Sequence, residues 1–495
     1  MKKLLIGLAV LVVAAGAIWS ALWFTGRGQI EDQMELELAR LEANGTTVTW
    51  QDRTIRGFPF GYEVVAEQVG ITNRENGILV RIPQVVSQAD ASDIDRVETS
   101  LIGQIQIDVP ITEELRNSDP RLPRIVNIRM TGDDLRVAVE GLAGNELRYT
   151  GKASQLALEI DQEDMPNRVN LSVSGLDGKL AQADGKWRFG TQVGQFDFSV
   201  DGMDETGVKS EFEIGIGTLS LTMAAEQSGP INLNEILFGN AEGSIEIAYS
   251  AGIITSRAVA SAPAGGGGTL RYSGSAGTGI IGIQDGVMEV RTESRENAWI
   301  VEPEDMEGSV RGTVQADTVQ ASYRLPTAPT EEPKPAGLRL AVVGLDGDET
   351  FWKTLDPGSV LDRSASEMLV DIEATAMVTD RLDVRSPTGR VPLFLSNISV
   401  NDLNVSALGG KVQASGDIEV LQPINLPLGK LDVRISNAYA VLNGLMRADL
   451  IDEPTWTAAT AMLQVYARPA EGDDMWETDV VFGNDGITVN GLQVQ

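Results

Sequence analysis

The side chains that most often perform catalysis are missing from this sequence. It contains neither histidine nor cysteine, which removes the usual general base, the Ser-His-Asp arrangement, thiol nucleophiles and thiolate zinc sites. The 71 Asp and Glu residues leave carboxylate chemistry, such as glycoside hydrolysis by two carboxyl groups, but no pair is distinguished by its spacing. We therefore expect no enzyme activity, no catalytic residue, no metal site and no cofactor.

Two aromatic segments are the best candidates for a binding site. One segment holds Phe58, Phe60 and Tyr62 around Gly and Pro, and the other begins with Phe351 and Trp352 beside a turn. Large aromatic side chains contribute much apolar contact area wherever they are buried. These five residues either line the mouth of an apolar groove or plug the open ends of a sheet where the chain turns.

β-Strands are the elements that must position these side chains. From Thr46 onward apolar and polar residues alternate, as where Ile105, Ile107 and Val109 alternate with polar neighbours. Strict alternation is typical of antiparallel sheets with one buried and one solvated face. Asn-Gly and Asp-Gly pairs, which favour tight hairpin turns, occur at 76–77, 177–178, 184–185 and 201–202. We predict a mainly β fold of extended, curved antiparallel sheets, and the pattern leaves open whether they form a groove, a half-barrel or a packed sandwich.

Composition shifts divide the chain into four parts. We predict a cytoplasmic tip and anchor over 1–26, a juxtamembrane spacer helix over 27–45, a first β module over 46–262 and a second over 269–495. A helix pair near 438–466 interrupts the second module, with Pro454 suited to the first turn of its second helix. The breaks at 261–268 and 326–335 are rich in Gly or Pro, which predicts exposed loops or module edges.

The stretch Leu4–Phe24 is uncharged and follows two lysines. It is long enough to cross a bilayer as a helix, and Trp19 and Trp23 suit the membrane interface. The alternative is a cleavable secretory signal, with Ala15-Gly16-Ala17 as the cleavage site. The lysines keep the N-terminus cytoplasmic under the positive-inside rule. We expect a single-pass inner (cytoplasmic) membrane protein with the bulk of the chain in the periplasm, which is exported under either interpretation.

The net charge of the chain is strongly negative. Its formal value is −32 at pH 7, and such a body repels phosphate backbones. Nucleic acid is therefore excluded as a partner, and solubility is the simplest explanation of the acidity.

Short motifs resemble a known family. The anchor, the spacer and the segments RGFPFGYEV (Arg56–Val64) and FWKTLDPG (Phe351–Gly358) resemble an alphaproteobacterial envelope family, domain of unknown function 2125. The segment at Leu361–Ser364 departs from the proline-flanked Arg-Asp pattern of that family. The C-terminal third, which ends in a hairpin at Gly486–Gly491, is similar to the wider AsmA-like group. That resemblance implies a membrane-anchored, long curved sheet with an apolar concave face, associated with lipid transport and outer-membrane homeostasis.

Three functional hypotheses follow. The first is a membrane-anchored periplasmic β-groove protein that binds or transfers lipid in envelope homeostasis, with the inner membrane (through Leu4–Phe24) and phospholipid acyl chains as partners. The second is a structural or regulatory envelope scaffold that acts through protein contacts and has no ligand. The third is a carboxylate-based hydrolase of cell-wall glycans. A continuous uncovered apolar trough would favour the first, and faces packed about 10 Å apart would favour the second.

Overall fold

The computed structural model divides the chain into two compact units. Unit 1 comprises Met1–Ala224 and Ser256–Ala264, and unit 2 comprises Ala225–Thr255 and Gly265–Gln495. The residues that the structure describes are 38–494 without 57–60, 75, 91–92, 112, 114–115, 117–122, 142–145, 161–167, 184–185, 204–206, 228–242, 262–266, 285, 305–308, 331, 380–392 and 423.

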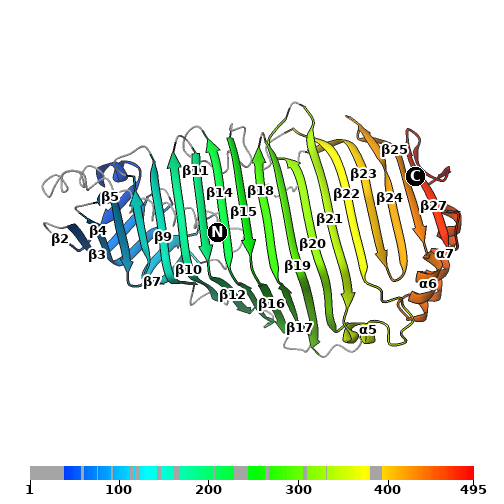
Figure 1. Cartoon of the computed structure of the whole chain (residues 1–495), viewed down its shortest axis with the longest axis horizontal. Coiled ribbons are helices and arrows are strands. Elements are labelled where there is room, and N and C mark those ends of the chain that lie inside the picture. The colour runs from blue at the N-terminus through cyan, green and yellow to red at the C-terminus, as the bar shows by residue number, and fades with distance from the viewer. Residues whose placement is uncertain are drawn as a thin grey trace. The chain divides into compact units, whose positions relative to one another are not determined.

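Unit 1 is a sheet of antiparallel strands in which chain neighbours pair with one another (Figure 1). Its strands are β1 (Thr46–Thr49), β2 (Asp52–Arg56), β3 (Gly61–Asn73), β4 (Leu79–Asp90), β5 (Asp93–Ile102), β6 (Ile105–Pro110), β7 (Ile125–Asp133), β8 (Arg136–Glu140), β9 (Leu147–Ile160), β10 (Arg168–Ala183), β11 (Lys186–Val193), β12 (Gln195–Met203), β13 (Lys209–Ile216), most of β14 (Leu219–Gln227) and most of β16 (Ile254–Ser261).

Many of these strands are halves of one longer strand. β5 and β6 pair with successive parts of β4, β7 and β8 with successive parts of β9, and β11 and β12 with successive parts of β10. The interruptions lie opposite one another and form a crease across the sheet, at residues with positive φ: Gln68, Gly103, Asp134 and Gly175. Residues with positive φ leave the extended conformation, so the strands change direction where they cross the crease.

The strands of unit 2 are also antiparallel, and its described residues include the helices α5, α6 and α7. Its elements are β15 (Gly243–Ala251), β17 (Gly267–Gly274), β18 (Ala276–Gln284), β19 (Val287–Glu304), β20 (Gly312–Pro326), β21 (Lys334–Gly347), α5 (Glu349–Leu355), β22 (Ser366–Val378), β23 (Leu393–Ala407), β24 (Gly410–Leu421), β25 (Leu426–Ser436), α6 (Ala438–Arg447), α7 (Glu453–Tyr466), β26 (Arg468–Pro469), β27 (Met475–Gly483), β28 (Gly486–Val489) and β29 (Leu492–Gln493).

Helices α5 and α7 begin at aspartates that cap them, Asp348 and Asp452. Asp452 accepts a hydrogen bond from the Thr455 amide at 2.9 Å, and Pro454 lies in the first turn of α7, as expected for a helix start. The indole of Trp456 donates to Asn443 Oδ1 at 3.1 Å and joins α7 to α6. The predicted helix pair and the mainly β fold are therefore confirmed. Helix α5 was not predicted.

Two local predictions are wrong. Asp177-Gly178 and Asp201-Gly202 lie inside β10 and β12 rather than in hairpin turns, because cross-strand pairing continues through both dipeptides. The stretch at 326–335 begins buried instead of exposed. Thr327 is 1% exposed and its amide donates to the carbonyl of Gly286 at 2.8 Å.

The N-terminal predictions are covered only in part. Residues 38–43 are helical, and the Asn44 amide donates to the carbonyl of Arg40, as expected at the predicted end of the spacer helix. Leu4–Phe24, with Trp19 and Trp23, lies outside the described residues. Within the part that is described, none of the helices has the length and hydrophobicity to cross a membrane.

Candidate functional site

One face of unit 1, here called its inner face, carries an unbroken row of apolar cross-strand partners. Side chains alternate between faces along a strand, so register partners lie side by side. The alternation shifts by one residue at the crease, as in β4, where Val80, Ile82 and Val85 all belong to one core cluster. The row runs from β1 to β13 through Val48, Ile71, Val80, Ile107, Ile128, Ile160, Val169, Val200 and Phe212.

Burial falls along this row. Ile71 and Ile128 are 4% and 1% exposed and belong to a core cluster of β3–β7, whereas Phe212 on β13 is 39% exposed. Beyond β8, the fully buried apolar residues described in unit 1 are Ala153, Val173 and Val193. The inner face is thus filled by its own side chains at β3–β8 and accessible toward β13. Large exposed apolar areas mark interaction sites.

The inner face of unit 2 repeats the pattern over more strands. Its row of partners runs through Ile247, Ile281, Val290, Tyr323, Leu338, Ile372, Val400, Gly416, Leu431, Val480 and Val489. Tyr323 and Leu338, which are direct partners, are 42% and 46% exposed in the middle of the row. Unit 2 therefore also presents apolar side chains that its own packing does not bury.

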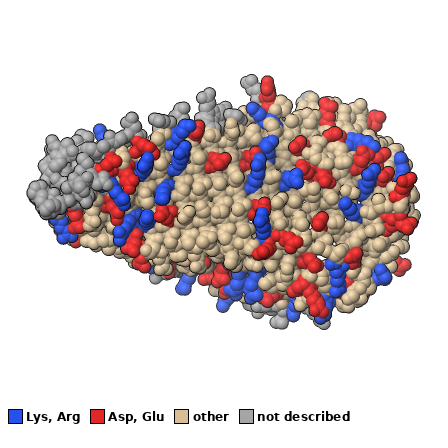
Figure 2. Space-filling view, viewed as in Figure 1, with Lys and Arg blue, Asp and Glu red and all other residues tan. Residues whose placement is uncertain are grey.

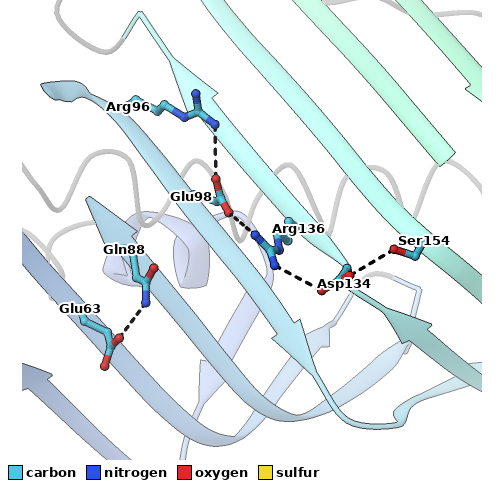
Figure 3. Close-up of polar contacts among 7 residues, drawn as sticks. All are labelled: Glu63, Gln88, Arg96, Glu98, Asp134, Arg136 and Ser154. Atoms are coloured by element: carbon cyan, nitrogen blue, oxygen red, sulfur yellow. Dashed lines mark hydrogen bonds and ion pairs between the residues drawn. The ribbon is translucent and has the colours of Figure 1, made fainter. Parts of the chain in front are cut away.

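The opposite, outer face of unit 1 carries ion pairs. Figure 3 shows Glu98 between two arginines, accepting from Arg96 Nη2 and from Arg136 Nη1 at 3.3 Å each. Arg136 also donates to Asp134 at 3.2 Å, and Ser154 Oγ donates to the other oxygen of Asp134 at the crease. Asp134 and then Glu98 raise the pKa of Arg136. These exposed pairs contribute little stability but mark the face that water covers.

A second polar group lies beside this network. Gln88 Nε2 donates to Glu63 at 2.7 Å, and Glu63 also pairs with Arg56. The hydrogen bond from Arg56, followed by that from Gln88, lowers the pKa of Glu63.

Figure 2 shows basic and acidic side chains interspersed on the visible surface rather than gathered into a patch of one sign.

The outer face of unit 2 contains a hollow of about 550 Å³ that is lined by Gly337 and by charged side chains such as Arg324 and Glu373. Its arginines already have acidic partners. Arg324 Nη2 lies 3.1 Å from Glu289, and Arg339 Nη1 lies 2.8 Å from Asp371. Because these arginines are already paired within the sheet, the hollow is a weaker candidate for a binding site than the inner faces.

The predicted aromatic site residues fall in different parts of the structure. Phe58 and Phe60 lie outside the described residues. Tyr62 is in β3 of unit 1, paired with Ala89, and its side chain is not described. Phe351 and Trp352 are in α5 of unit 2, with ring centroids 5.4 Å apart in an edge contact. Their role at a groove mouth remains a prediction.

Contacts among residues 346–363 fix the chain around α5, and this segment is here called the corner. Trp352 Nε1 donates to Asp346 at 3.1 Å, and the Arg363 guanidinium lies 5.5 Å from the indole centroid. Asp356 is fully buried and accepts from the amides of Val360 and Leu361 at 3.0 Å each. Burial raises the pKa of Asp356, but these amides and Arg363 outweigh it and hold that pKa below its usual value.

Sequence reasoning missed a pair of inner-face glycines in unit 1. Gly151 on β9 is the direct partner of Gly178 on β10, and Thr191 on β11 is the next partner. A Cβ built on Gly151 would meet no heavy atom within 4 Å, so the space above this position is open. The adjoining Tyr149 is partly buried, which raises the pKa of its phenol. The sequence feature that could have indicated this position is a glycine within a strand pattern, because such a glycine often marks the close approach of a ligand or of another backbone segment.

A protein-family comparison covers this part of the chain. The family model described as "Uncharacterized protein conserved in bacteria (DUF2125)" matches residues 23–276, just over half of the chain. The chain belongs to the DUF2125 family. The match includes the RGFPFGYEV segment and the Gly151–Gly178 pair of this DUF2125 protein and ends before FWKTLDPG. No curated protein matches the chain.

Acidic side chains do not assemble into a metal site in the described ranges. Across 38–494, apart from the gaps given above, no cluster of three or more Asp or Glu residues is arranged to hold a metal ion.

Proposed function

We propose that this DUF2125 protein is a membrane-anchored envelope protein whose inner faces bind or transfer lipid acyl chains. The observation that carries the proposal is the accessible end of the inner face of unit 1. There, Phe198, Phe212 and Ile214 lie on adjacent strands, and the rings of Phe198 and Phe212 are 6.5 Å apart. The uncharged stretch Leu4–Phe24 would hold the sheet at the inner membrane, where acyl lipids are available.

An acyl chain suits this face for a physical reason. The row of register partners is continuous across strands spaced about 4.8 Å apart, so an extended apolar chain can contact one side chain after another. Each Å² of apolar surface that leaves water contributes about 25 cal/mol. The charged outer face offers no comparable surface, since its carboxylates and guanidinium groups are solvated.

Photocrosslinking in cells tests the proposal with the full chain. Phe198 is replaced by benzoylphenylalanine in a Gram-negative host grown with ³²P-phosphate. Illumination should then give a radiolabelled phospholipid adduct. The matched control is the same replacement at Asp197, which is the next residue of β12 but belongs to the outer face. Equal labelling at both positions, or none at Phe198, would reject lipid binding on this face.

A second function is favoured by the buried core of β3–β7. That part of unit 1 packs its apolar side chains against one another. A scaffold that binds no ligand would be packed in this way along its whole length. Under this alternative, Phe198 crosslinks to envelope proteins and not to lipid.

A further inference from the structure

The glycine pair of unit 1 lies on β9 and β10, and β11 is the next neighbour of β10 in the sheet (Figure 1). One row of inner-face partners contains Tyr149, Leu180 and Phe189, and the next contains Gly151, Gly178 and Thr191. Thr191 Oγ1 lies 3.6 Å from the position that a Cβ of Gly178 would take. The hydroxyl therefore lies beside Gly178, and the open space is at its cross-strand partner Gly151.

Two polar atoms of β11 on this face are buried without a hydrogen-bond partner: Thr191 Oγ1 and Trp187 Nε1. Phe189 lies between them on the same strand face. Buried donors without acceptors are rare in folded proteins and cost about 1–3 kcal/mol each. Thr191 belongs to the row of the glycine pair and Trp187 lies two inner-face positions farther along β11, so one ligand that extends along this face can supply both acceptors.

The surroundings restrict the chemistry of that ligand. The inner-face positions of the three strands are all uncharged: Leu147, Tyr149, Gly151, Ala153, Leu176, Gly178, Leu180, Gln182, Trp187, Phe189, Thr191 and Val193. An anionic phosphate or carboxylate would find no cation among them, and removing it from water is costly. A neutral acceptor joined to an apolar body fits instead.

We infer that the inner face around this glycine pair binds the ester-carbonyl region of an acyl lipid, with Thr191 and Trp187 as hydrogen-bond donors. The inference rests on the proposed function and specifies its ligand: an ester-linked lipid is preferred over an ether-linked lipid with the same chains and headgroup. The acyl chains lie along the inner face beside Tyr149, Leu180 and Phe189.

The test compares two phospholipids that differ only in their linkages. Full-length protein in amphipol is titrated with a fluorescent phosphatidylcholine in the diester form and in the dialkyl-ether form. The wild type should bind the diester about five- to thirtyfold more tightly, the range expected for one or two neutral hydrogen bonds. Thr191→Val and Trp187→Phe should each reduce that preference about fivefold and leave ether-lipid binding unchanged. Thr150→Val, on the outer face of β9, is the matched control and should keep the preference.

A steric variant tests the location separately. Gly151→Leu should weaken binding of both lipids at least tenfold because the new side chain fills the open space. Gly282→Leu is its control, because Gly282 also has no neighbour within 4 Å of its Cβ position but lies between Glu246 and Glu289 on the outer face of β18.

The outcomes separate the two proposals. Equal affinity of the wild type for both lipids, or a preference that survives in Thr191→Val and Trp187→Phe, overturns the ester site and leaves acyl binding intact. The latter result would mean that water satisfies the two donors. Failure of the wild type to bind either lipid overturns the proposed function together with this inference.

Discussion

Replacing Asp356 should destabilise unit 2 more than any exposed carboxylate replacement. This carboxylate is 0% exposed and serves three donors: the amides of Val360 and Leu361 at 3.0 Å and Arg363 Nη2 at 3.3 Å. Arg363 also donates to the Asp356 carbonyl at 2.9 Å. Asp356 therefore holds the chain that leaves α5 in one conformation, and Asp356→Ala removes the acceptor common to the three donors.

The expected loss of unfolding free energy follows from the hydrogen-bond donors that lose their acceptor. Each buried donor left unsatisfied costs about 1–3 kcal/mol, and breaking one side of a buried ion pair costs about 3–5 kcal/mol. Arg363 is 30% exposed, so its guanidinium can turn partly to water, which favours the lower part of the range. We expect Asp356→Ala to reduce the free energy of unfolding by about 3–4 kcal/mol. At roughly 2 °C per kcal/mol for a unit of this size, Tm falls by about 6–8 °C.

The assay is thermal unfolding of the full-length protein by calorimetry from pH 3 to pH 8, with Glu373→Ala on the exposed outer face of β22 as control. The folded-state pKa of Asp356 is lowered, so its carboxylate stabilises the protein fully above the unfolded pKa of about 3.9 and loses that contribution as pH falls further. The difference in Tm between wild type and Asp356→Asn should therefore be constant from pH 5 to pH 8 and shrink below about pH 4. A loss under 1 kcal/mol for Asp356→Ala, or a difference that grows in acid, would refute the reasoning.

Three further predictions concern packing and capping and are measured by urea unfolding of the full chain. Ile128→Ala should lower the free energy of unfolding by about 2–5 kcal/mol because Ile128 is 1% exposed, whereas Phe212→Ala at 39% exposure should lower it by under about 1 kcal/mol. Equal losses would contradict the burial gradient of the inner face. Asn490→Ala should cost about 2–3 kcal/mol, because Asn490 has φ 48°, accepts from the Asp479 amide at 3.0 Å and donates to the Tyr466 carbonyl at 2.8 Å. Asn490→Gly should recover part of that loss, and no recovery would exclude the backbone contribution. Asp452→Ala should cost about 1 kcal/mol by removing the cap of α7, while Asp452→Ser should be nearly neutral.

Much of the fold could be predicted from local patterns. The alternation at Ile105–Val109 corresponds to β6, and Pro454 marks the first turn of α7. Both patterns depend on a few consecutive residues, so the sequence contains them. Asp177-Gly178 shows the limit of such reasoning. The same dipeptide that favours a hairpin turn is held in β10 by pairing with β9 on one side and β11 on the other, and that pairing is absent from any local pattern.

The candidate site was predictable only as a class of surface. Alternation indicated an apolar face, yet the aromatic segments chosen as its mouth were selected for size and composition. Phe351 and Trp352 prove to be part of the corner around Asp356 and Arg363, which is built from bonds between residues 346 and 363. Gly151, Gly178 and Thr191 are far apart in the chain and come together only through register.

The amino-acid sequence alone determined the absence of histidine and cysteine chemistry, the negative charge and the side chains that share one face within each uninterrupted stretch of strand, because alternation follows from strand geometry. Only the tertiary structure decided where the strands bend and how deeply each part of the inner face is buried. Burial depends on which strands lie opposite one another. The crease and the register therefore fill the face at β3–β8 and leave it open beside Gly151 and Phe212.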